Sequence, residues 1–545
     1  MLSLPSVLTA RFTAAAGVDP QMRPATKPQF GHFQSNVALR LAKAEGRPPR
    51  EVAQALVDRI EVADLCEPLE IAGPGFLNVR IRSDVLARVA TEVLLDDRAG
   101  IDVTADPQTI VIDYSAPNVA KPMHVGNLRS TIIGDCFRRV LAAQGHRVLA
   151  QNHIGDWGTQ FGMLVEQLLF EEADASAMTL DDSVALYRRA QAHFRSDEEF
   201  ADAARRRVVA LQAGDPQTRE IWQALIEVSE RGFDEAYDRL GVLLTRDDLA
   251  GESMYNDALP DIAADLERRG IATIDDGALC VFLDGQQTPL IVRKGDGGYG
   301  YATTDLAALR YRTAELGADR IIYVVGVPQT FHFEQVFAVA RKAGYLPAGV
   351  LAEHVGFGQV LGPDGKMFKT RDGATVTLNA LLDAAEEVAA RPVAMAAVKY
   401  ADLSNSLHKD YVFDVERLTA TIGNTGPYLQ YAHARASGIL RNASERGIAW
   451  TPSVTILDEP SEQALALLLS RFGEIVAEVG EHLQPHKLCG YLYDLATAMS
   501  VFYEQCPVLK SEGDVRASRL ALCAATRKVL ATGLGLLGIV APDRM

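Results

Sequence analysis

The sequence has no apolar run that approaches the roughly 20 residues needed to cross a lipid bilayer. Its first segment, MLSLPSVLTARFTAAAG, lacks a basic leader ahead of a sustained apolar stretch and so does not have the pattern of a signal peptide. We therefore expect a soluble, cytoplasmic protein with no membrane partner.

Cysteine is scarce and scattered. The six cysteines form no CxxC pair and no cluster with histidine. Zinc sites and the disulfide frameworks of small domains depend on closely spaced cysteines, so the sequence argues against both. We expect buried thiols and no structural metal. The cysteines are Cys66, Cys136, Cys280, Cys489, Cys506 and Cys523.

Positive charge is also in deficit. Lys and Arg total 54 against 71 for Asp and Glu, which gives a formal net charge of −17. Sequence-independent affinity for DNA comes from a basic surface, so we expect no DNA partner. A folded RNA is compatible with this charge, because basic side chains can gather on one face while the acidic residues lie elsewhere.

What the chain does have is length and apolar content for several cores: 545 residues with 48% hydrophobic composition predict about two to four domains. Residues 1–105 are typical of a mixed α+β domain. Residues 106–375 alternate strands and helices, with helical and β-rich insertions at about 165–300, and residues 376–545 predict an all-helical bundle. The alternation predicts a Rossmann-type, doubly wound α/β core.

The clearest strand-to-helix junction begins with TIVIDY, Thr109 to Tyr114, which is β-branched and apolar enough for a buried strand. The loop SAPNVAKPMHVGN follows, and apolar residues then recur at helical spacing until Gly145. Because the first amides of a helix lack partners and carry partial positive charge, we expect this junction to bind an anion, most often a phosphate.

The tetrapeptide HVGN, His124 to Asn127, lies in this loop. Ligands of open parallel sheets bind beyond the carboxyl ends of the strands. There, Gly126 would let an adenine lie against bare backbone, and His124 would contact phosphate. The alternative is a loop histidine that is satisfied by backbone contacts.

A second loop, GPDGKMFKTRDG from Gly362 to Gly373, presents Lys366 and Lys369. Two lysines on such a loop could neutralise a triphosphate whose charge shifts as the α–β bond breaks. The alternative is an exposed basic turn, which is common. Together the two loops indicate nucleotide chemistry more strongly than either does alone.

HVGN followed about 240 residues later by KMFKT resembles the paired signatures HIGH and KMSKS of the class I aminoacyl-tRNA synthetases. HIGDWGTQFG, GESMYN, KYADLSNS and NTGPYLQYAHAR are similar, in the same order, to stretches of arginyl-tRNA synthetases. FQSNVALRLAK and IAGPGFLNVRI resemble that family's N-terminal domain, which contacts the elbow of tRNA. The likeness covers essentially the whole chain.

The resemblance implies an arginine-tRNA ligase that makes arginyl-adenylate and pyrophosphate from arginine and ATP, and then transfers arginine to the 3′ end of tRNA(Arg). It also implies Mg²⁺ with ATP, adenylate formation that awaits bound tRNA, and an anticodon-binding helical domain. We expect a monomer. Two readings from other classes stay open: a non-catalytic RNA-binding relative, and a different nucleotidyltransferase with the same nucleotide loops.

The same resemblance matches residues to the nucleotide. No protein nucleophile is needed, so cations and positioning should carry the catalysis. Asn127 departs from the family, which usually has histidine there, and its amide cannot carry positive charge. For His332 a helix-capping role is the alternative. The residues matched to the phosphates are Lys121, His124, Asn127, Lys366 and Lys369, and those matched to the rest of the nucleotide are Val125, Gly126, His332, Gly358 and Met367.

A guanidinium is planar, always charged and forked, so its recognition takes opposed carboxylates. Glu252 and Asp305 are candidates, and Tyr301 lies one helical turn before Asp305 on the same face. The alternative for each acid taken singly is a surface residue on a solvated helix. The resemblance supports all three as arginine-binding residues. It matches Asp113, Ser115, Asn118 and Gln329 to the surroundings of the same substrate, with Asn118 and Gln329 at its α-amino and carboxylate end.

Two aromatic features have a structural and a functional interpretation. Tyr428 and Tyr431 lie on one side of a predicted helix, where they either belong to the core or stack on anticodon bases. We expect Trp157 to be a core anchor, with Gly155 and Asp156 shaping its loop.

Overall fold

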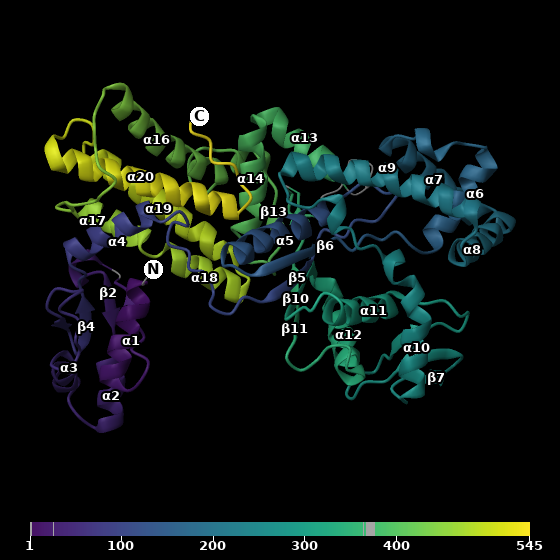
Figure 1. Ribbon diagram of the computed structural model, residues 1–545, viewed down its shortest axis with the longest axis horizontal. Helices are drawn as coiled ribbons and strands as arrows, with labels where there is room; N and C mark the ends of the chain where they lie inside the picture. Colours follow the sequence, from purple (N-terminus) through teal and green to yellow (C-terminus); the bar gives the residue numbers. More distant parts are fainter. Residues whose placement is uncertain (1–2, 26, 363, 367–375) are drawn as a thin grey trace. The chain divides into compact units, whose positions relative to one another are not determined.

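The computed structural model describes residues 3–545 apart from 26, 363 and 367–375 (Figure 1). Its contacts divide the chain into two compact units. The core unit covers residues 104–420 and 537–539, and the terminal unit covers residues 1–103, 421–536 and 540–545. The boundaries of the three domains expected from the sequence remain a prediction.

The core unit is built on a four-stranded sheet in the order β11-β10-β5-β6, with all neighbours parallel. The central strands β5 (Thr109–Asp113) and β10 (Arg320–Gly326) are apolar and mostly buried, as expected for a sheet covered on both faces. The outer strands are β6 (Arg147–Gln151) and β11 (Leu351–Phe357). Ile112 of β5 lies opposite Ala150 of β6 and Ile322 of β10.

Two crossover helices lead from the middle of this sheet to opposite edges. α5 (Val125–Ala143) follows β5 and leads to β6, and α12 (Thr330–Ala343) follows β10 and leads to β11. The carboxyl ends of β5 and β10 therefore form the switch point at which open α/β sheets bind ligands. The doubly wound core predicted from the sequence is confirmed.

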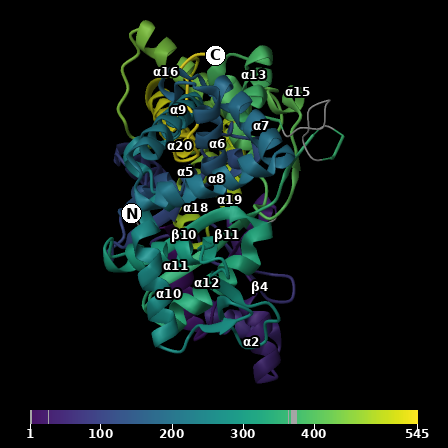
Figure 2. The ribbon, with the colours of Figure 1, turned by 90° about the vertical axis from the view of Figure 1, so that its right-hand side faces the viewer.

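Between β6 and β10 the chain inserts a group of helices and a small antiparallel sheet. The helices α6–α9 are drawn above α10 in Figures 1 and 2, and Figure 1 shows β7 of the small sheet beside α10. The longest of these helices, α9, starts with Asp215 as a side-chain cap and Pro216 in its first turn, which favours helix initiation. The inserted elements are α6 (Thr159–Glu171), η2 (Ala175–Ala177), α7 (Leu180–Ser196), α8 (Glu198–Ala213), α9 (Pro216–Leu240), η3 (Arg246–Asp248), η4 (Glu252–Ala258), α10 (Leu259–Arg268), β7 (Thr273–Asp275), β8 (Ala278–Val281), β9 (Leu290–Arg293) and α11 (Tyr301–Ala314).

One hydrophobic cluster holds α11 in place. Leu306 and Leu309 of α11 are fully buried in a cluster with Ile262 of α10, Val292 of β9 and Val336 of α12. Burial of this many aliphatic side chains fixes the rotation of α11 about its axis. The opposite, polar side of the helix, which carries two of the predicted arginine-binding residues, is fixed with it.

A buried ion pair joins α5 to α14. Arg129 Nε lies 3.0 Å from Asp402 Oδ1, and the two side chains are 1% and 0% exposed. Arg129 also donates to the Lys409 carbonyl at 3.0 Å, and the rings of Phe357 and Tyr411 flank its guanidinium. The elements in this part are η5 (Val327–Gln329), β12 (Val360–Leu361), α13 (Leu378–Val388), α14 (Arg391–Leu403), β13 (Tyr411–Val412), which pairs in parallel with β12, and α15 (Val415–Leu418).

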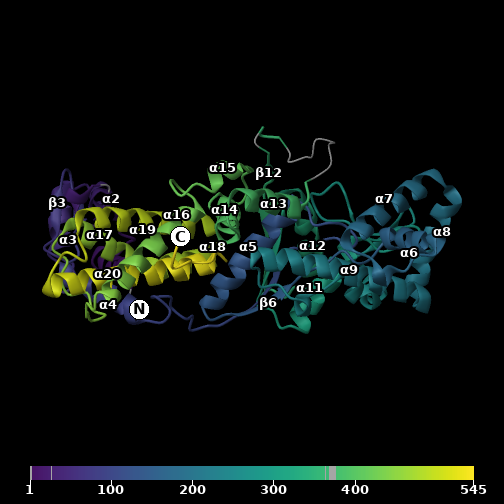
Figure 3. The same ribbon diagram turned by 90° about the horizontal axis from the view of Figure 1, so that it is seen from above.

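The terminal unit contains an antiparallel sheet in the order β1-β2-β4-β3 and a helical bundle. The strand, turn and strand predicted for LEIAGPGFLNVRI are β3 and β4. Figures 1 and 3 show α16, α19 and α20 side by side. The elements are α1 (Leu4–Ala16), β1 (Arg23–Pro24), η1 (Pro28–Phe30), β2 (Phe33–Ser35), α2 (Val37–Glu45), α3 (Pro49–Val57), β3 (Glu70–Ala72), β4 (Phe76–Val79), α4 (Ser83–Leu95), α16 (Gly426–Glu445), α17 (Pro460–Leu469), α18 (Phe472–His482), α19 (Pro485–Gln505) and α20 (Gly513–Leu536).

Two sequence features can be checked directly. In the part of the chain that the structure describes, no helix is long and apolar enough to cross a bilayer. All six cysteines lie in that part, and each is a buried free thiol.

Asp402→Ala should destabilise the protein by about 3–5 kcal/mol, because it leaves the charge of Arg129 buried without its partner. The measurement is the free energy of unfolding in urea, followed by circular dichroism. Arg205→Ala is the matched control. It breaks an ion pair with Asp202 between exposed side chains and should cost less than about 1 kcal/mol. Equal losses in the two variants would contradict the importance of the buried pair.

Candidate active site

His124 begins α5 as its N-cap residue. Its Nδ1 accepts a hydrogen bond from the Gly126 N–H at 3.0 Å, and the side-chain oxygen of Asn127 accepts one from the His124 N–H at 3.0 Å, which completes a capping box. Since Nδ1 is the acceptor, the proton of the neutral imidazole lies on Nε2. Desolvation, followed by the charge of Lys121, lowers the pKa of His124 and favours this neutral form.

The first three backbone N–H groups of α5 already have hydrogen-bond partners within the protein. The Val125 N–H donates to the Val376 carbonyl at 3.2 Å, the Gly126 N–H donates to the His124 ring at 3.0 Å, and the Asn127 N–H donates to the His124 carbonyl at 2.8 Å. These are the groups that a phosphate at the helix N-terminus would contact first. These three amides are therefore not free in this structure, and the expected contact between helix amides and a phosphate remains a prediction.

A cavity of about 420 Å³ opens beside the cap. Its walls come from the carboxyl ends of β5, β10 and β11 and from the first turns of α5, so it lies at the switch point of the sheet. Its volume is in the range of small-molecule sites, about 300–1,000 Å³. The predicted site residues that line it are Ser115, His124, Val125, Gly126, Asn127 and Gly358.

Both ends of the KMFKT loop are attached near this cavity. After the loop, the Leu378 N–H donates to the Met123 carbonyl at 2.8 Å, one residue before the cap. Before the loop, Gly358 packs so closely on the chain near β13 that an added Cβ would lie 2.5 Å from Asp410 Oδ1 and 2.7 Å from the Lys409 carbonyl carbon. The segment after the KMFKT loop is therefore attached next to the HVGN turn, and the segment before it packs on the chain near β13.

The predicted lysines of this loop are only partly described. Lys366 is exposed in a turn in which its carbonyl accepts a hydrogen bond from the Gly362 N–H at 2.8 Å. Lys369 and Met367 lie outside the residues that the structure describes. The described residues therefore show the expected phosphate site mainly from the side of the HVGN turn.

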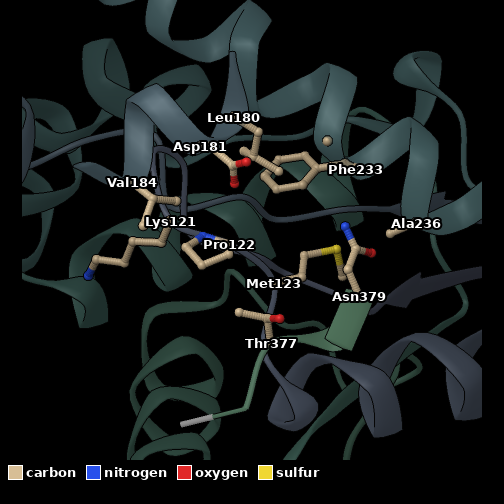
Figure 4. Close-up of a pocket in the computed structure, with 11 residues that line it drawn as sticks. Lys121, Pro122, Met123, Leu180, Asp181, Val184, Phe233, Ala236, Thr377 and Asn379 are labelled. Atoms are coloured by element: carbon tan, nitrogen blue, oxygen red, sulfur yellow. The ribbon is translucent and has the colours of Figure 1, made fainter. Parts of the chain in front are cut away.

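Lys121 lies at the border between the HVGN loop and the helical insertion. Its Nζ is 4.8 Å from the ring centre of Tyr187 in α7. Lys121 also lines a second cavity of about 110 Å³, in which Figure 4 shows Phe233 of α9 and Met123 reaching into the same space while the Lys121 side chain extends away from them. The ammonium group therefore faces the insertion.

Glu252 and Asp305 come from different elements, and the negative charge of Asp305 acts on Glu252. Glu252 begins η4, and Asp305 lies in the first turns of α11. Burial, followed by the negative charges of Asp156 and Asp305, raises the pKa of Glu252 to about 8. Among the described side chains, no lysine or arginine forms an ion pair with Glu252 or Asp305. The two acids form a negative site without an internal guanidinium or ammonium.

Two further predicted residues lie beside these acids. His332 Nε2 is 2.6 Å from Asp305 Oδ2. The sequence matched His332 to the nucleotide, but the structure places it outside the walls of the larger cavity and against Asp305. Tyr301 begins α11 with 74% of its surface exposed, one turn before Asp305.

Asp113, at the end of β5, is paired inside the protein. Its Oδ2 accepts a hydrogen bond from Arg312 Nη2 at 2.6 Å, and Arg312 Nε donates to Gln151 Oε1 at 2.6 Å. Sequence reasoning missed Arg312, although it follows Asp305 by seven residues and so lies two turns away on the same face of α11. Arg312 takes up one oxygen of the Asp113 carboxylate, which ties α11 to the central strand.

The remaining substrate-side residues lie in the loops after β5 and β10. The buried Ser115 hydroxyl is 2.7 Å from the Tyr237 hydroxyl of α9. Asn118 pairs with Gly155 in a β-bridge. Gln329 ends η5 just before α12 and is exposed. Ser115 thus makes a contact that supports the loop, while Asn118 and Gln329 lie at the switch point.

Comparison with known families matches three segments of the chain. The catalytic domain of class I tRNA synthetases (R) matches residues 89–393, the DALR anticodon binding domain matches residues 429–545, and the arginyl tRNA synthetase N-terminal domain matches residues 6–81. The first of these models alone covers more than half of the chain. The three matched ranges follow one another along the chain without overlap.

Full-length relatives and solved structures agree. The chain is 62% identical to arginine–tRNA ligase of Cutibacterium acnes over 100% of both chains, and 49% identical to that of Thermobifida fusca over 99% of both. The crystal structure of arginyl-tRNA synthetase from Plasmodium falciparum superposes with a TM-score of 0.84 at 26% identity, covering 100% of both chains. The Thermus thermophilus arginyl-tRNA synthetase gives 0.82 at 26% identity, covering 99% of this chain and 100% of that one.

A doubly wound sheet with the HVGN turn at its switch point, followed by a helical domain of the anticodon-binding type, defines a class I aminoacyl-tRNA synthetase. The similarity to full-length arginine–tRNA ligases identifies arginine as its amino acid. The chain belongs to the arginyl-tRNA synthetase family, and its function is the ATP-dependent ligation of arginine to tRNA. The resemblance drawn from the sequence is confirmed, and neither the non-catalytic reading nor the other nucleotidyltransferase is supported.

Gly358→Ala should lower the rate of arginine-dependent ATP–pyrophosphate exchange and destabilise the protein by about 1–3 kcal/mol, because the added methyl overlaps the chain at Asp410. Thermal unfolding and exchange are the measurements. Gly349→Ala is the control, since an added Cβ there meets nothing within 4 Å. Unchanged exchange in Gly358→Ala would show that the support of the loop tolerates displacement.

Proposed function

We propose that Glu252 and Asp305 bind the guanidinium group of arginine between them. The observation that carries this proposal is that two partly buried acids from different elements have no lysine or arginine partner among the described side chains. Burial and the neighbouring negative charges raise the pKa of Glu252 to about 8, as expected for like charges that lack a cation between them. A guanidinium supplies donors in a planar fork that can reach two carboxylates, whereas an ammonium is a single point charge. The pocket should therefore reject lysine.

The rest of the arginine molecule would extend toward the carboxyl ends of β5 and β10. We assign Asn118 to the α-amino group and Gln329 to the carboxylate, because both lie in the loops at the switch point. Tyr301 would cover the guanidinium from the solvent side. Asp113 and Ser115 would support the site without direct contact with arginine. Asp113 is hydrogen-bonded to Arg312, and the Ser115 hydroxyl is hydrogen-bonded to that of Tyr237.

We propose that ATP occupies the 420 Å³ cavity. The adenine would lie against Val125, Gly126 and Gly358, with Met367 nearby. His332, because of its bond to Asp305, is better assigned to the arginine side than to the nucleotide.

In the reaction, the carboxylate of arginine attacks the α-phosphate of ATP in line and pyrophosphate leaves. The terminal ribose hydroxyl of tRNA then attacks the acyl carbon and AMP leaves. His124 would donate its Nε2 proton as a hydrogen bond to a phosphate oxygen, a role open to the neutral ring. Lys121, Lys366 and Lys369 would offset the phosphate charge, and Asn127 would keep His124 in place.

Mg²⁺ would accompany ATP and be held mainly by the phosphate oxygens. In the described part of the chain, no group of three or more His, Cys, Asp or Glu side chains could hold a metal ion. Such a bound ion would neutralise charge on the phosphates.

For the tRNA we propose a base-stacking contact on the helical bundle. Arg435 lies 4.6 Å from the ring centre of Tyr431 and 5.2 Å from that of Tyr503, and the two tyrosines are among the exposed large side chains. Tyr428 instead packs on Tyr493 at 5.7 Å between ring centres. This favours Tyr431 for stacking on anticodon bases and Tyr428 for packing. The N-terminal domain would contact the tRNA elbow.

We also propose that the protein works as a monomer in the cytoplasm, with neither DNA nor a membrane as partner. Cytoplasmic ribosomes consume the charged tRNA. The net charge of −17 disfavours DNA.

Asp305→Ala should reduce arginine-dependent exchange at least about a hundredfold, since removing one partner of a buried charged contact costs about 3–5 kcal/mol. The assay is ATP–pyrophosphate exchange with and without tRNA. Asp261→Ala, at an exposed acid in the first turn of α10, is the control and should match the wild type. Exchange within threefold of wild type in Asp305→Ala would remove Asp305 from the arginine site.

Arginine binding should strengthen as the pH rises from about 7 to about 9. With a pKa of about 8, Glu252 is largely protonated below that pH in the free protein, and it must lose its proton to face a cation. Binding should then release protons, which calorimetry in two buffers of different ionisation enthalpy measures. Glu252→Gln should bind arginine weakly and without this proton release. Proton release that persists in Glu252→Gln would assign the titration to another group.

A further inference from the structure

The short segment Ile154 to Asp156 connects the two ends of the proposed arginine site. On one side, the Gly155 N–H donates to the Pro117 carbonyl at 3.1 Å, and the Val119 N–H donates to the Gly155 carbonyl at 3.1 Å. These bonds enclose the loop position of Asn118. On the other side, the Glu252 N–H donates to the Ile154 carbonyl at 3.1 Å. Three residues thus set the spacing between the two ends.

The carboxylate of Asp156 strengthens the second of these attachments. It is 4% exposed and accepts two hydrogen bonds from Ser253, from the N–H at 2.9 Å and from the hydroxyl at 2.5 Å. Gly251 packs directly on this carboxylate, where an added Cβ would overlap it. Residues on both sides of Glu252 are therefore fitted to Asp156. The Trp222 Nε1–H donates to the Asp156 carbonyl at 2.8 Å and anchors the segment to α9.

Asp156 also acts on Glu252 through its charge. After burial, Asp156 is the largest cause of the raised pKa of Glu252, ahead of Asp305. Two other titratable groups lie near these acids. The pKa of Tyr301 is raised by burial and then by the charge of Glu252, and His332 forms a hydrogen bond with Asp305. His153 lies on the Asp156 side. Asp156 itself is bonded to Ser253, so it is not free to contact arginine.

We propose that Asp156 is a positioning residue that holds Glu252 at a fixed distance from the Asn118 loop and places a buried carboxylate beside it. The proposal rests on the proposed role of Glu252. Two properties of Asp156 are involved, and they can be separated. The hydrogen bonds to Ser253 set the position of Glu252, and the negative charge sets the pH at which Glu252 ionises.

The test is aminoacylation of tRNA between about pH 6.5 and pH 9, with KM for arginine and for ATP measured separately in three variants. Asp156→Asn keeps an acceptor for Ser253 but removes the charge. It should shift the pH dependence of the arginine KM to lower pH by about half a unit or more. Ser253→Ala keeps the charge but removes one donor. It should raise the arginine KM about fivefold or more without moving the pH dependence. Neither variant should change the ATP KM more than about twofold.

Glu252→Gln distinguishes failure of this inference from failure of the proposed site. If Glu252→Gln raises the arginine KM but Asp156→Asn leaves both the KM and its pH dependence at wild-type values, Asp156 has no such role. If Glu252→Gln itself leaves the arginine KM unchanged, the proposed arginine site fails.

Folding is controlled by thermal unfolding of each variant. Should Asp156→Asn fail to fold, Ser253→Ala decides the positioning part. An equal rise of the arginine and ATP KM in Ser253→Ala would indicate general disruption and overturn the proposal.

Discussion

The site depends on two acids, Glu252 and Asp305, that the described chain leaves without a lysine or arginine partner. Glu252 lies half-buried within reach of the charges of Asp156 and Asp305, and its pKa rises to about 8 as a result. In the described chain, neither Glu252 nor Asp305 is paired with a lysine or arginine. Such an arrangement is costly in the empty protein, and in the proposed function a bound guanidinium would relieve the cost. If the proposed site is correct, selectivity for arginine would follow from the same arrangement, because a fork of donors can reach both acids.

The same fold shows what happens to an acid that is not reserved for a ligand. Asp113 lies at the end of the central strand, and the chain supplies its own guanidinium to it from Arg312. Arg312 comes from α11, the helix that also carries Asp305. The hydrophobic face of α11 fixes its rotation. One helix therefore offers an internal arginine to Asp113 and, to the proposed arginine site, an acid whose described partner is His332. Packing and charge placement are therefore coupled in this helix.

Local patterns of the sequence predicted the main elements of the core, but the sequence did not reveal the contacts between distant segments. β5 and α5 were predictable because apolar periodicity reports local structure, and the doubly wound core followed from their alternation. The pairing of Asp113 with Arg312 joins residues 199 apart, and that of Asp156 with Ser253 joins residues 97 apart across an insertion. The occupied amides of α5 were missed for another reason, since His-x-x-Asn is not a usual capping box.

Asn127 shows how the HVGN turn works without the second histidine usual in the family. Its side-chain oxygen accepts the His124 N–H, and His124 in turn accepts the Gly126 N–H, so both side chains rigidify the turn. Neither adds a positive charge, because Asn127 cannot be protonated and the pKa of His124 is lowered. In the proposed reaction, neutralisation of the phosphates would then fall to the lysines, while the turn would contribute position and one imidazole donor. A rigid neutral donor costs no reorganisation during phosphoryl displacement, so the turn can serve catalysis through geometry alone.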